Sequence, residues 1–172
     1  NSTVTAFSVG HITPVSIKAG RTLSGVVTVT GGSIKLGETG TLASNITMSG
    51  GTLDADETLT LSGALSHSGN ITIDVAENKT LTYSGTAINV GANTTTLSGG
   101  GRLVSGGITL NDAQSKLLLT PITLDSASTS ANSLGLDVDA NSTVTAFSVG
   151  HITPVSIKAN RTLSGSITVT AG

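Results

Sequence analysis

Residues 54–63 read DADETLTLSG, and they contain the phrase that decides the fold: a turn of Gly, Asn or Asp, then Thr, then Leu or Val, then Ser or Thr. Segments of the same kind recur along the whole chain: KAGRTLSG (18–25), AENKTLTYSG (76–85), GANTTTLSGG (91–100), DANSTVTAFSVG (139–150) and KANRTLSG (158–165). Repetition of a short unit is the sequence signature of a solenoid, in which each repeat forms one turn and stacks on its neighbours.

The apolar residue of each phrase measures the repeat. Nine such residues follow one another at similar but unequal intervals: Val4, Leu23, Leu42, Leu59, Leu81, Leu97, Leu118, Val144 and Leu163. The seven intervals from Val4 to Val144 average about 20 residues, a length typical of solenoid repeats. Because turns of a β-solenoid stack about 4.8 Å apart, we expect these nine residues to form one inward-facing aliphatic ladder.

A longer repeat contains the short one. Residues 1–32 and 141–172 align without gaps and are identical at 28 of 32 positions. The four differences are Gly20/Asn160, Val26/Ser166, Val27/Ile167 and Gly31/Ala171. Since the offset between the two copies holds seven short repeats, each long unit begins at the same rotation of the coil. We therefore expect one elongated domain over residues 1–172, made of one unit (1–140) and the start of the next (141–172).

Local patterns predict strands. Apolar residues alternate with Thr or Ser in four segments, as in a half-buried strand: Val26–Thr30, Asn70–Val75, Gly107–Leu110 and Ser166–Thr170. Gly, Asn and Asp tolerate left-handed backbone. We therefore expect positive φ at Gly20 and Asn160, and at the matching turn positions Asn1, Asp56, Asn78 and Asn141. The predicted fold is an all-β, right-handed parallel β-solenoid (β-helix) of about eight turns.

The coil length, the Asn/Gly-turn–Thr–Leu phrase and the richness in Ser, Thr and Gly resemble those of right-handed parallel β-helices of bacterial surface proteins. Autotransporter passenger domains and filamentous-haemagglutinin-like adhesins are the most similar in style. The resemblance covers the whole chain, and it is one of pattern without a diagnostic motif. It implies an extracellular, cell-surface stalk or adhesin, and it supplies no functional residue.

Composition excludes several classes of function. Only 10% of the residues are charged, and the eight Lys and Arg are scattered, so no basic stripe offers a nucleic-acid surface. No apolar run approaches the roughly 20 residues of a membrane span. The absence of Cys removes disulfides, thiolate catalysis and Cys-zinc sites.

Ionisable residues do not suggest catalysis. His11 and His151 are copies of one position seven turns apart, and His67 has no partner at the spacing of metal ligands. Five carboxylates fall at corresponding stretches of consecutive turns: Asp54, Asp56, Glu57, Asp74 and Glu77. Polysaccharide-cleaving β-helices stack acids in this way, but they also need basic and aromatic residues. We expect no enzyme, no catalytic residue, no metal and no cofactor, and a polysaccharide-active enzyme is the remote alternative.

Small residues, all Thr or Ser except Ala43, flank eight of the nine anchors: Thr3/Thr5, Thr22/Ser24, Thr41/Ala43, Thr58/Thr60, Thr80/Thr82, Thr96/Ser98, Thr143/Thr145 and Thr162/Ser164. If the anchors point inward, these pairs point outward on one flat face. Regular Thr-x-Thr arrays resemble ice-binding solenoids, so a ligand-binding adhesin or an ice-binding face is the alternative function. The other interpretation is that Thr is a strand former that suits a wet surface.

Seven of the ten Asn begin an N-x-T sequon: Asn1, Asn45, Asn70, Asn78, Asn93, Asn141 and Asn160. They are candidate N-glycosylation sites on exposed turns, although the turn phrase itself also places Asn before Thr.

Both ends of the chain are ordinary repeats without a cap, and a bare solenoid end is an open sheet edge. We therefore expect further repeats or further copies to stack on the ends as a fibre. The predicted function is a structural repeat module of a long extracellular protein: a stalk, filament or adhesin shaft. Its partner is itself, with a glycan or host-surface ligand as the alternative, and without nucleic acid.

Overall fold

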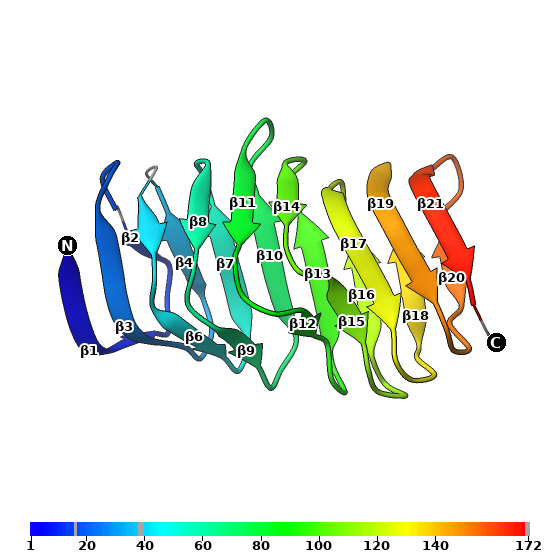
Figure 1. Cartoon of the computed structure of the whole chain (residues 1–172), viewed down its shortest axis with the longest axis horizontal. Helices are drawn as coiled ribbons and strands as arrows, with labels where there is room; N and C mark the ends of the chain where they lie inside the picture. Colours follow the sequence, from blue (N-terminus) through cyan, green and yellow to red (C-terminus); the bar gives the residue numbers. More distant parts are fainter. Residues whose placement is uncertain (16, 38–39, 171–172) are drawn as a thin grey trace.

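The computed structural model describes residues 1–15, 17–37 and 40–170. Its regular elements are all β-strands, and no helix occurs in these ranges. The strands form two sheets that run side by side along one long axis, with the two termini at opposite ends (Figure 1). All pairings between the named strands are parallel. The predicted all-β parallel solenoid of about eight turns is therefore confirmed.

The first sheet has thirteen strands in the described ranges. They are β1 (Ser2–Val9), β3 (Thr22–Val29), β5 (Thr41–Leu42), β6 (Asn45–Met48), β8 (Leu59–Leu61), β9 (Leu65–His67), β11 (Thr80–Tyr83), β12 (Ile88–Asn89), β14 (Arg102–Val104), β15 (Ile108–Leu110), β17 (Thr123–Thr129), β19 (Ser142–Val149) and β21 (Leu163–Val169).

The second sheet has eight strands there, one for each turn. They are β2 (Thr13–Val15), β4 (Ser33–Leu36), β7 (Gly51–Ala55), β10 (Ile71–Val75), β13 (Thr94–Ser98), β16 (Lys116–Leu119), β18 (Gly135–Val138) and β20 (Val155–Ile157). We number the turns coil 1 to coil 8 by these strands, so that coil 1 contains β1 and β2, and coil 8 contains β19 and β20. Strand β21 begins coil 9.

The four predicted strands are all present, within a few residues of their expected bounds, as β3, β10, β15 and β21. Their alternation works as expected, because residues at every second position point into the coil. In β10, for example, Ile71, Ile73 and Val75 are buried, while Thr72 and Asp74 face outward and are only partly covered.

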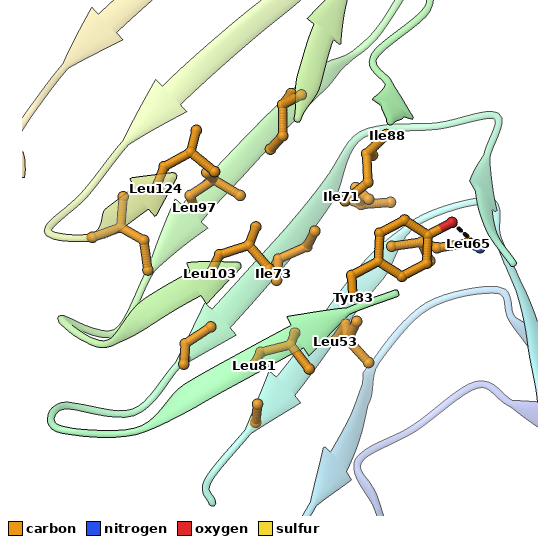
Figure 2. Packing of buried hydrophobic residues seen from close by; sticks show 14 of the residues in the cluster. Leu53, Leu65, Ile71, Ile73, Leu81, Tyr83, Ile88, Leu97, Leu103 and Leu124 are labelled. Atoms are coloured by element: carbon orange, nitrogen blue, oxygen red, sulfur yellow. Dashed lines mark hydrogen bonds between the residues drawn. The ribbon is translucent and has the colours of Figure 1, made fainter. Parts of the chain in front are cut away.

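Columns of aliphatic side chains fill the space between the two sheets. One column of the first sheet joins Leu59, Leu81, Leu103, Leu124 and Val144 in register. The facing column of the second sheet joins Ile34, Leu53, Ile73, Leu97, Leu119 and Val138. Figure 2 shows the central part of this core, in which each residue stacks on its counterpart one coil away.

Tyr83 is the one aromatic residue in the middle coils, and its ring is buried in the core. It stacks on Leu61 of the preceding coil. Its hydroxyl oxygen accepts a hydrogen bond from the backbone N–H of Leu65 at 3.1 Å (Figure 2). This bond satisfies a donor at the bend between β8 and β9, which would be costly to bury unpaired.

The prediction of one ladder is correct for burial at most positions and wrong in its register. Leu42, Leu59, Leu81, Leu97 and Val144 are buried, and Val4, Leu23 and Leu163 are half-buried. Leu97, however, belongs to the second sheet. Leu42 pairs with Leu61, and Leu59 pairs with Leu81. The recurring phrase occurs in both sheets, and its place in the hydrogen-bond register shifts by two residues between some coils. Aligning the phrases by sequence similarity therefore groups residues that are not register partners.

The ladder prediction is also wrong about the orientation of Leu118. It is half-exposed and points outward between Leu117 and Leu119, which are fully buried. A shift of one residue moves a side chain to the other face of a strand. In the run of Leu117 to Leu119, periodicity does not distinguish which residues point inward.

The turn prediction is confirmed at Gly20, Asn160 and Asn78, with φ values of 69°, 61° and 62°. It is wrong at Asp56 and Asn141, which are not among the residues with positive φ. Asn141 instead uses its side chain, since its Oδ1 accepts a hydrogen bond from the backbone N–H of Thr162 one coil ahead.

Candidate functional site

The outer faces of the coils carry most of the polar groups, and many of these groups connect one coil to the next. The Asn residues of the sequons provide the first example. The Oδ1 atoms of Asn1, Asn45, Asn70 and Asn141 accept hydrogen bonds from backbone N–H groups of Thr22, Ala64, Thr94 and Thr162, at 2.8–3.0 Å. Each of these bonds connects one coil to the next along the chain.

This capping explains why Asn recurs in the turns without any glycan. Asn132, which is not in a sequon, accepts the same bond from Ile152 of the next coil, and Asn111 accepts a similar bond from Gly91 of the preceding coil. Six of the seven sequon residues are exposed, and Asn93 is half-exposed with its Nδ2 donating to the carbonyl of Val90. The sequons are accessible at the surface, and their spacing follows from the coil.

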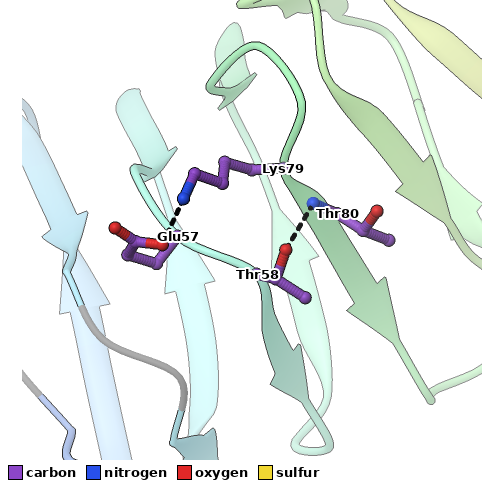
Figure 3. A network of polar contacts seen from close by, with 4 residues as sticks. All are labelled: Glu57, Thr58, Lys79 and Thr80. Carbon is purple, nitrogen blue, oxygen red and sulfur yellow. Dashed lines mark hydrogen bonds and ion pairs between the residues drawn. The ribbon is translucent and has the colours of Figure 1, made fainter.

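Ion pairs also link neighbouring coils. Lys79 Nζ lies 2.6 Å from Glu57 Oε2, and beside it the N–H of Thr80 donates to Thr58 Oγ1 at 3.2 Å (Figure 3). The other described pairs have the same inter-coil geometry: Lys35 with Asp54 and Asp56, Arg102 with Asp125, Lys116 with Asp137, and Lys158 with Asp139. Since all of them are partly exposed, water screens the charges and each pair adds little to the stability of the stack.

The carboxylates fall on consecutive coils as predicted, since Asp54 and Asp74 are register partners in β7 and β10. Sequence reasoning missed Lys35, the register partner of Asp54 on the preceding coil. The sequence did indicate this contact, because Lys35 and Asp54 are separated along the chain by the length of one coil. Burial raises the pKa of Asp54, and the adjacent Asp56 carboxylate raises it further against the opposing effect of Lys35. Hydrogen bonds to Asp56 and Asp54 raise the pKa of Lys35.

The ion pair between Lys35 and Asp54 does not have the same weight in the pKa shifts of its two partners. For Lys35 the ion pair dominates, whereas for Asp54 the loss of water and the second carboxylate outweigh the cation. Asp54 is the more buried partner and faces Asp74 as well as Asp56, so burial and the neighbouring carboxylates decide the direction in which its pKa moves. The cluster is therefore a crowded group of acids sharing one cation.

The Thr-x-Thr pairs do not form the expected single flat face. Thr22, Thr41, Thr60 and Thr82 are in register, so the first residue of two pairs aligns with the second residue of two others. The next residue of this column is Val104. The pair Thr96/Ser98 lies on the second sheet, in β13. The uneven coil lengths break the array.

A different hydroxyl column runs along the outer face of the first sheet in two stretches, with no described pairing between β9 and β12 to join them. Ser8, Thr28, Thr47 and Ser66 are in register, and so are Asn89, Thr109, Ser128, Ser148 and Thr168. Hydroxyl oxygens lie 3.4 Å apart between Thr47 and Ser66, and 3.2 Å apart between Thr109 and Ser128. Sequence reasoning missed this column, because its residues lie several positions after the Leu phrase.

The histidines lie apart. His11 and His151 are exposed and seven coils from each other, while His67 contacts the carbonyl oxygen of Gly69 through Nδ1 at 3.0 Å. Among the described residues, no group of three or more His, Asp or Glu side chains could hold a metal ion. The described chain also contains no helix that could cross a membrane.

A shallow polar hollow of about 290 Å³ lies along the outside of coils 7 to 9. Its lining includes Thr123, Asn141, Thr143, Thr162 and Ser164. Sites for small ligands usually have volumes of about 300–1,000 Å³ and apolar or aromatic walls. The hollow is at the lower limit of this range and has no aromatic residue in its lining.

No known protein family, curated protein or solved structure matches the chain. The likeness to autotransporter passenger domains and filamentous-haemagglutinin-like adhesins therefore stays one of sequence pattern, and the structure shows a parallel β-solenoid.

Proposed function

We propose that the chain is a structural repeat module of a long extracellular fibrous protein, serving as a stalk, filament or adhesin shaft. One observation carries the proposal: the long repeat corresponds to seven whole coils. Strand β1 of coil 1 returns as β19 of coil 8, and β3 returns as β21, with the same register shift after Val4 and after Val144. Further units can therefore continue the rod without a change of rotation.

The mechanism of such a module is mechanical. Backbone ladders, the aliphatic columns and the inter-coil Asn and ion-pair contacts all resist separation of neighbouring coils along the axis. Each coil contacts chiefly its neighbours, so stability increases with the number of coils, as in other solenoids. No catalytic step is assigned to the module.

Chains with one, two and three copies of residues 1–140, each followed by 141–172, test the shaft. Small-angle scattering and electron microscopy should show a rod whose length increases by about 34 Å per added unit, because seven coils rise about 4.8 Å each. Constant length with increasing cross-section would contradict the proposal. Protease treatment of intact native cells tests the extracellular location, since an exposed shaft is cleaved and an internal protein is protected.

A second candidate is ligand binding through the outer face of the first sheet, and the hydroxyl column through Thr28 and Thr109 favours it. Its stacked hydroxyls suit ordered water at an ice surface or the hydroxyls of a glycan. Thermal hysteresis and glycan-array binding test these two ligands, with Thr28→Val and Thr109→Val as variants that remove the hydroxyls and keep the β-branched shape.

Glycosylation of the seven sequons is proposed separately. An intact mass of native material equal to that of the bare polypeptide would reject it.

A further inference from the structure

One junction between neighbouring coils lacks a backbone ladder that the other junctions have. In coils 3 to 6 the first sheet has two strands per coil, and the second of these forms one flank of the sheet. This second flank consists of β6, β9, β12 and β15, with the C-terminal parts of β1, β3, β17, β19 and β21. Neighbouring coils pair along it at every described junction except that between coils 4 and 5, where β9 and β12 are unpaired. We call this junction the seam, and it lies in the interior of the rod.

A difference in coil length explains why the ladder stops at the seam. Leu61 of coil 4 and Tyr83 of coil 5 are register partners. The strand that follows begins at Leu65 in coil 4, four residues later, and at Ile88 in coil 5, five residues later. Both Leu65 and Ile88 are buried. A change of one residue turns a strand to its other face, so β12 cannot keep its apolar residue inside and continue the ladder of β9.

The side chain of Tyr83 occupies the seam in place of the ladder. At the preceding junction Ile46, the register partner of Leu65, donates its backbone N–H to the carbonyl oxygen of Ala64 in the following coil. The corresponding N–H of Leu65 donates to the Tyr83 hydroxyl at 3.1 Å (Figure 2). Gly85 leaves room for the phenol ring, because a Cβ atom there would overlap its hydroxyl. A side-chain contact thus replaces a backbone bond at this point.

Two inward-facing positions at the seam carry polar side chains. His67 continues a column of buried aliphatic residues formed by Val9, Val29 and Met48. Thr95 is fully buried in a column whose other members are Ile71, Leu117 and Leu136. His67 Nδ1 lies 3.0 Å from the carbonyl oxygen of Gly69, and His67 Nε2 lies 3.5 Å from Thr95 Oγ1 across the seam. A hydrogen bond of that length is weak, so the pair stabilises the junction less than aliphatic stacking does elsewhere.

The contacts that remain keep the seam closed. Strand β8 pairs with β11, and β10 pairs with β13. At the corner before β13, the N–H of Thr94 donates to Asn70 Oδ1 at 2.8 Å. In a solenoid, stability is approximately a sum of terms for the single repeats and for the interfaces between them. The interface with the weakest contacts then opens at the lowest free energy.

We propose that the seam is a joint of the rod, at which coils 1 to 4 separate from coils 5 to 9 before either block of coils unfolds. Opening breaks two short ladders and exposes His67, Tyr83 and Thr95, while the ladders within each block stay intact. The proposal goes beyond the shaft function, because it concerns where the rod yields. Within such a shaft, each complete unit would contain one compliant joint between two stiffer blocks.

Hydrogen exchange of single backbone amides, followed by NMR on the 172-residue chain, tests the joint. The N–H of Ser84 donates to Leu61 across the seam at 2.9 Å. Two references make the same kind of bond at 2.9 Å across neighbouring junctions: Ser62 to Leu42 between coils 3 and 4, and Arg102 to Lys79 between coils 5 and 6. After correction for intrinsic rates, Ser84 should exchange roughly tenfold faster than both references.

The two references also separate the joint from fraying of the ends. Opening that spreads from one end of the rod gives rates that change steadily along the chain, so it cannot make Ser84 faster than references on both sides. Exchange of Ser84 that is no faster than that of both references would overturn the proposal. The shaft proposal would stay intact, since rod length is measured separately.

A disulfide across the seam provides a second test, because the chain has no Cys of its own. Thr72 and Thr96 are register partners in β10 and β13, on adjacent strands about 4.8 Å apart, within the range for a disulfide. Oxidised Thr72→Cys/Thr96→Cys should slow the exchange of Ser84 to the rate of Ser62, and reduction should reverse this. The matched control Thr52→Cys/Thr72→Cys joins coils 3 and 4 and should leave Ser84 unchanged. An unchanged Ser84 rate in the oxidised seam variant would contradict opening at the seam.

Substitutions test which side chains make the seam weak. His67→Met/Thr95→Val gives both columns aliphatic side chains of similar size and should slow the exchange of Ser84 relative to Ser62 severalfold. Tyr83→Phe keeps the ring and leaves the N–H of Leu65 without its acceptor, so it should accelerate Ser84 relative to Ser62. The ratio of the two rates removes any uniform change in stability. A ratio that moves in the opposite direction in either variant would overturn the role assigned to that residue or pair.

Discussion

Val27 and Ile167 occupy the same position of the duplicated segment, yet Val27 is 2% exposed and Ile167 is 51% exposed. Both are inward-facing residues of equivalent strands, β3 and β21. The exposed fractions differ because the following coil covers only one of them. Val27 is the register partner of Ile46 in β6 of the following coil, whereas the described partner of Ile167 is Phe147 of the preceding coil. Burial at this position is therefore decided by stacking and not by local sequence.

This pair of positions gives the first prediction. Val27→Asn should lower the free energy of unfolding by roughly 2–4 kcal/mol, because it removes buried apolar surface and buries an amide. Ile167→Asn should change it by less than about 1 kcal/mol, since the side chain is half in water. Urea unfolding followed by circular dichroism measures both. Equal effects in the two variants would contradict the stacking explanation.

The run of Leu117, Leu118 and Leu119 provides a second test within one strand. Leu117→Ala and Leu119→Ala should each cost about 2–5 kcal/mol, as is usual for fully buried leucines. Leu118→Ala, which truncates the outward-facing side chain, should cost about 1 kcal/mol or less. The three variants have the same change in composition, so the comparison isolates orientation. A larger loss for Leu118→Ala than for its neighbours would show that the register of β16 is wrong.

Substitution of two glycines should have very different effects on stability, costly at Gly25 and tolerated at Gly20. A Cβ atom at Gly25, where φ is 133°, would lie 1.7 Å from the carbonyl oxygen of Val4 in the preceding coil. Gly25→Ala should therefore separate the two coils and cost several kcal/mol, roughly 2–4. Gly20 has no neighbour within 4 Å of such an atom, and its copy is Asn160 with a similar φ. Gly20→Asn should leave the melting temperature almost unchanged, and a large loss there would contradict the assigned turn.

The acidic cluster predicts a pH effect. Because the pKa of Asp54 in the folded chain is raised above its ordinary value of 3.8, the folded state binds more protons than the unfolded state just above that value. Its contribution to stability then falls as pH rises from about 3.8 through the raised pKa, and it is constant at higher pH. The variant Asp54→Asn has no ionisable group at this position, so it should not show this loss of stability.

Urea unfolding of the unsubstituted chain and of Asp54→Asn from pH 3 to pH 7 measures the effect as a difference. The variant should gain stability relative to the unsubstituted chain as pH rises. Lys35 sets no opposing trend in this range, because its raised pKa acts only near and above 10.5. A difference that is constant, or that decreases with pH, would show that the Lys35 ion pair outweighs burial at Asp54.

The sequence by itself determined the class of fold, the number of turns and the length of the unit. A period of about 20 residues, strand-forming Thr, Val and Ile, and turns of Gly and Asn leave few alternatives to a parallel solenoid. Near-identity of 1–32 with 141–172 sets the length of the long unit, which is the offset of 140 residues between the two copies. These features are local or periodic, so they are visible along one chain.

Only the tertiary structure decided which residues meet. Hydrogen-bond register between coils placed Leu97 on the second sheet, turned Leu118 outward, joined Lys35 to Asp54, and aligned Ser128 with Ser148 while breaking the Thr-x-Thr array. Coils of unequal length shift this register by one or two positions, and a shift of one residue exchanges the inner and outer faces. The packing of neighbouring coils selects the register, because it must bury the aliphatic columns and satisfy the backbone at the same time.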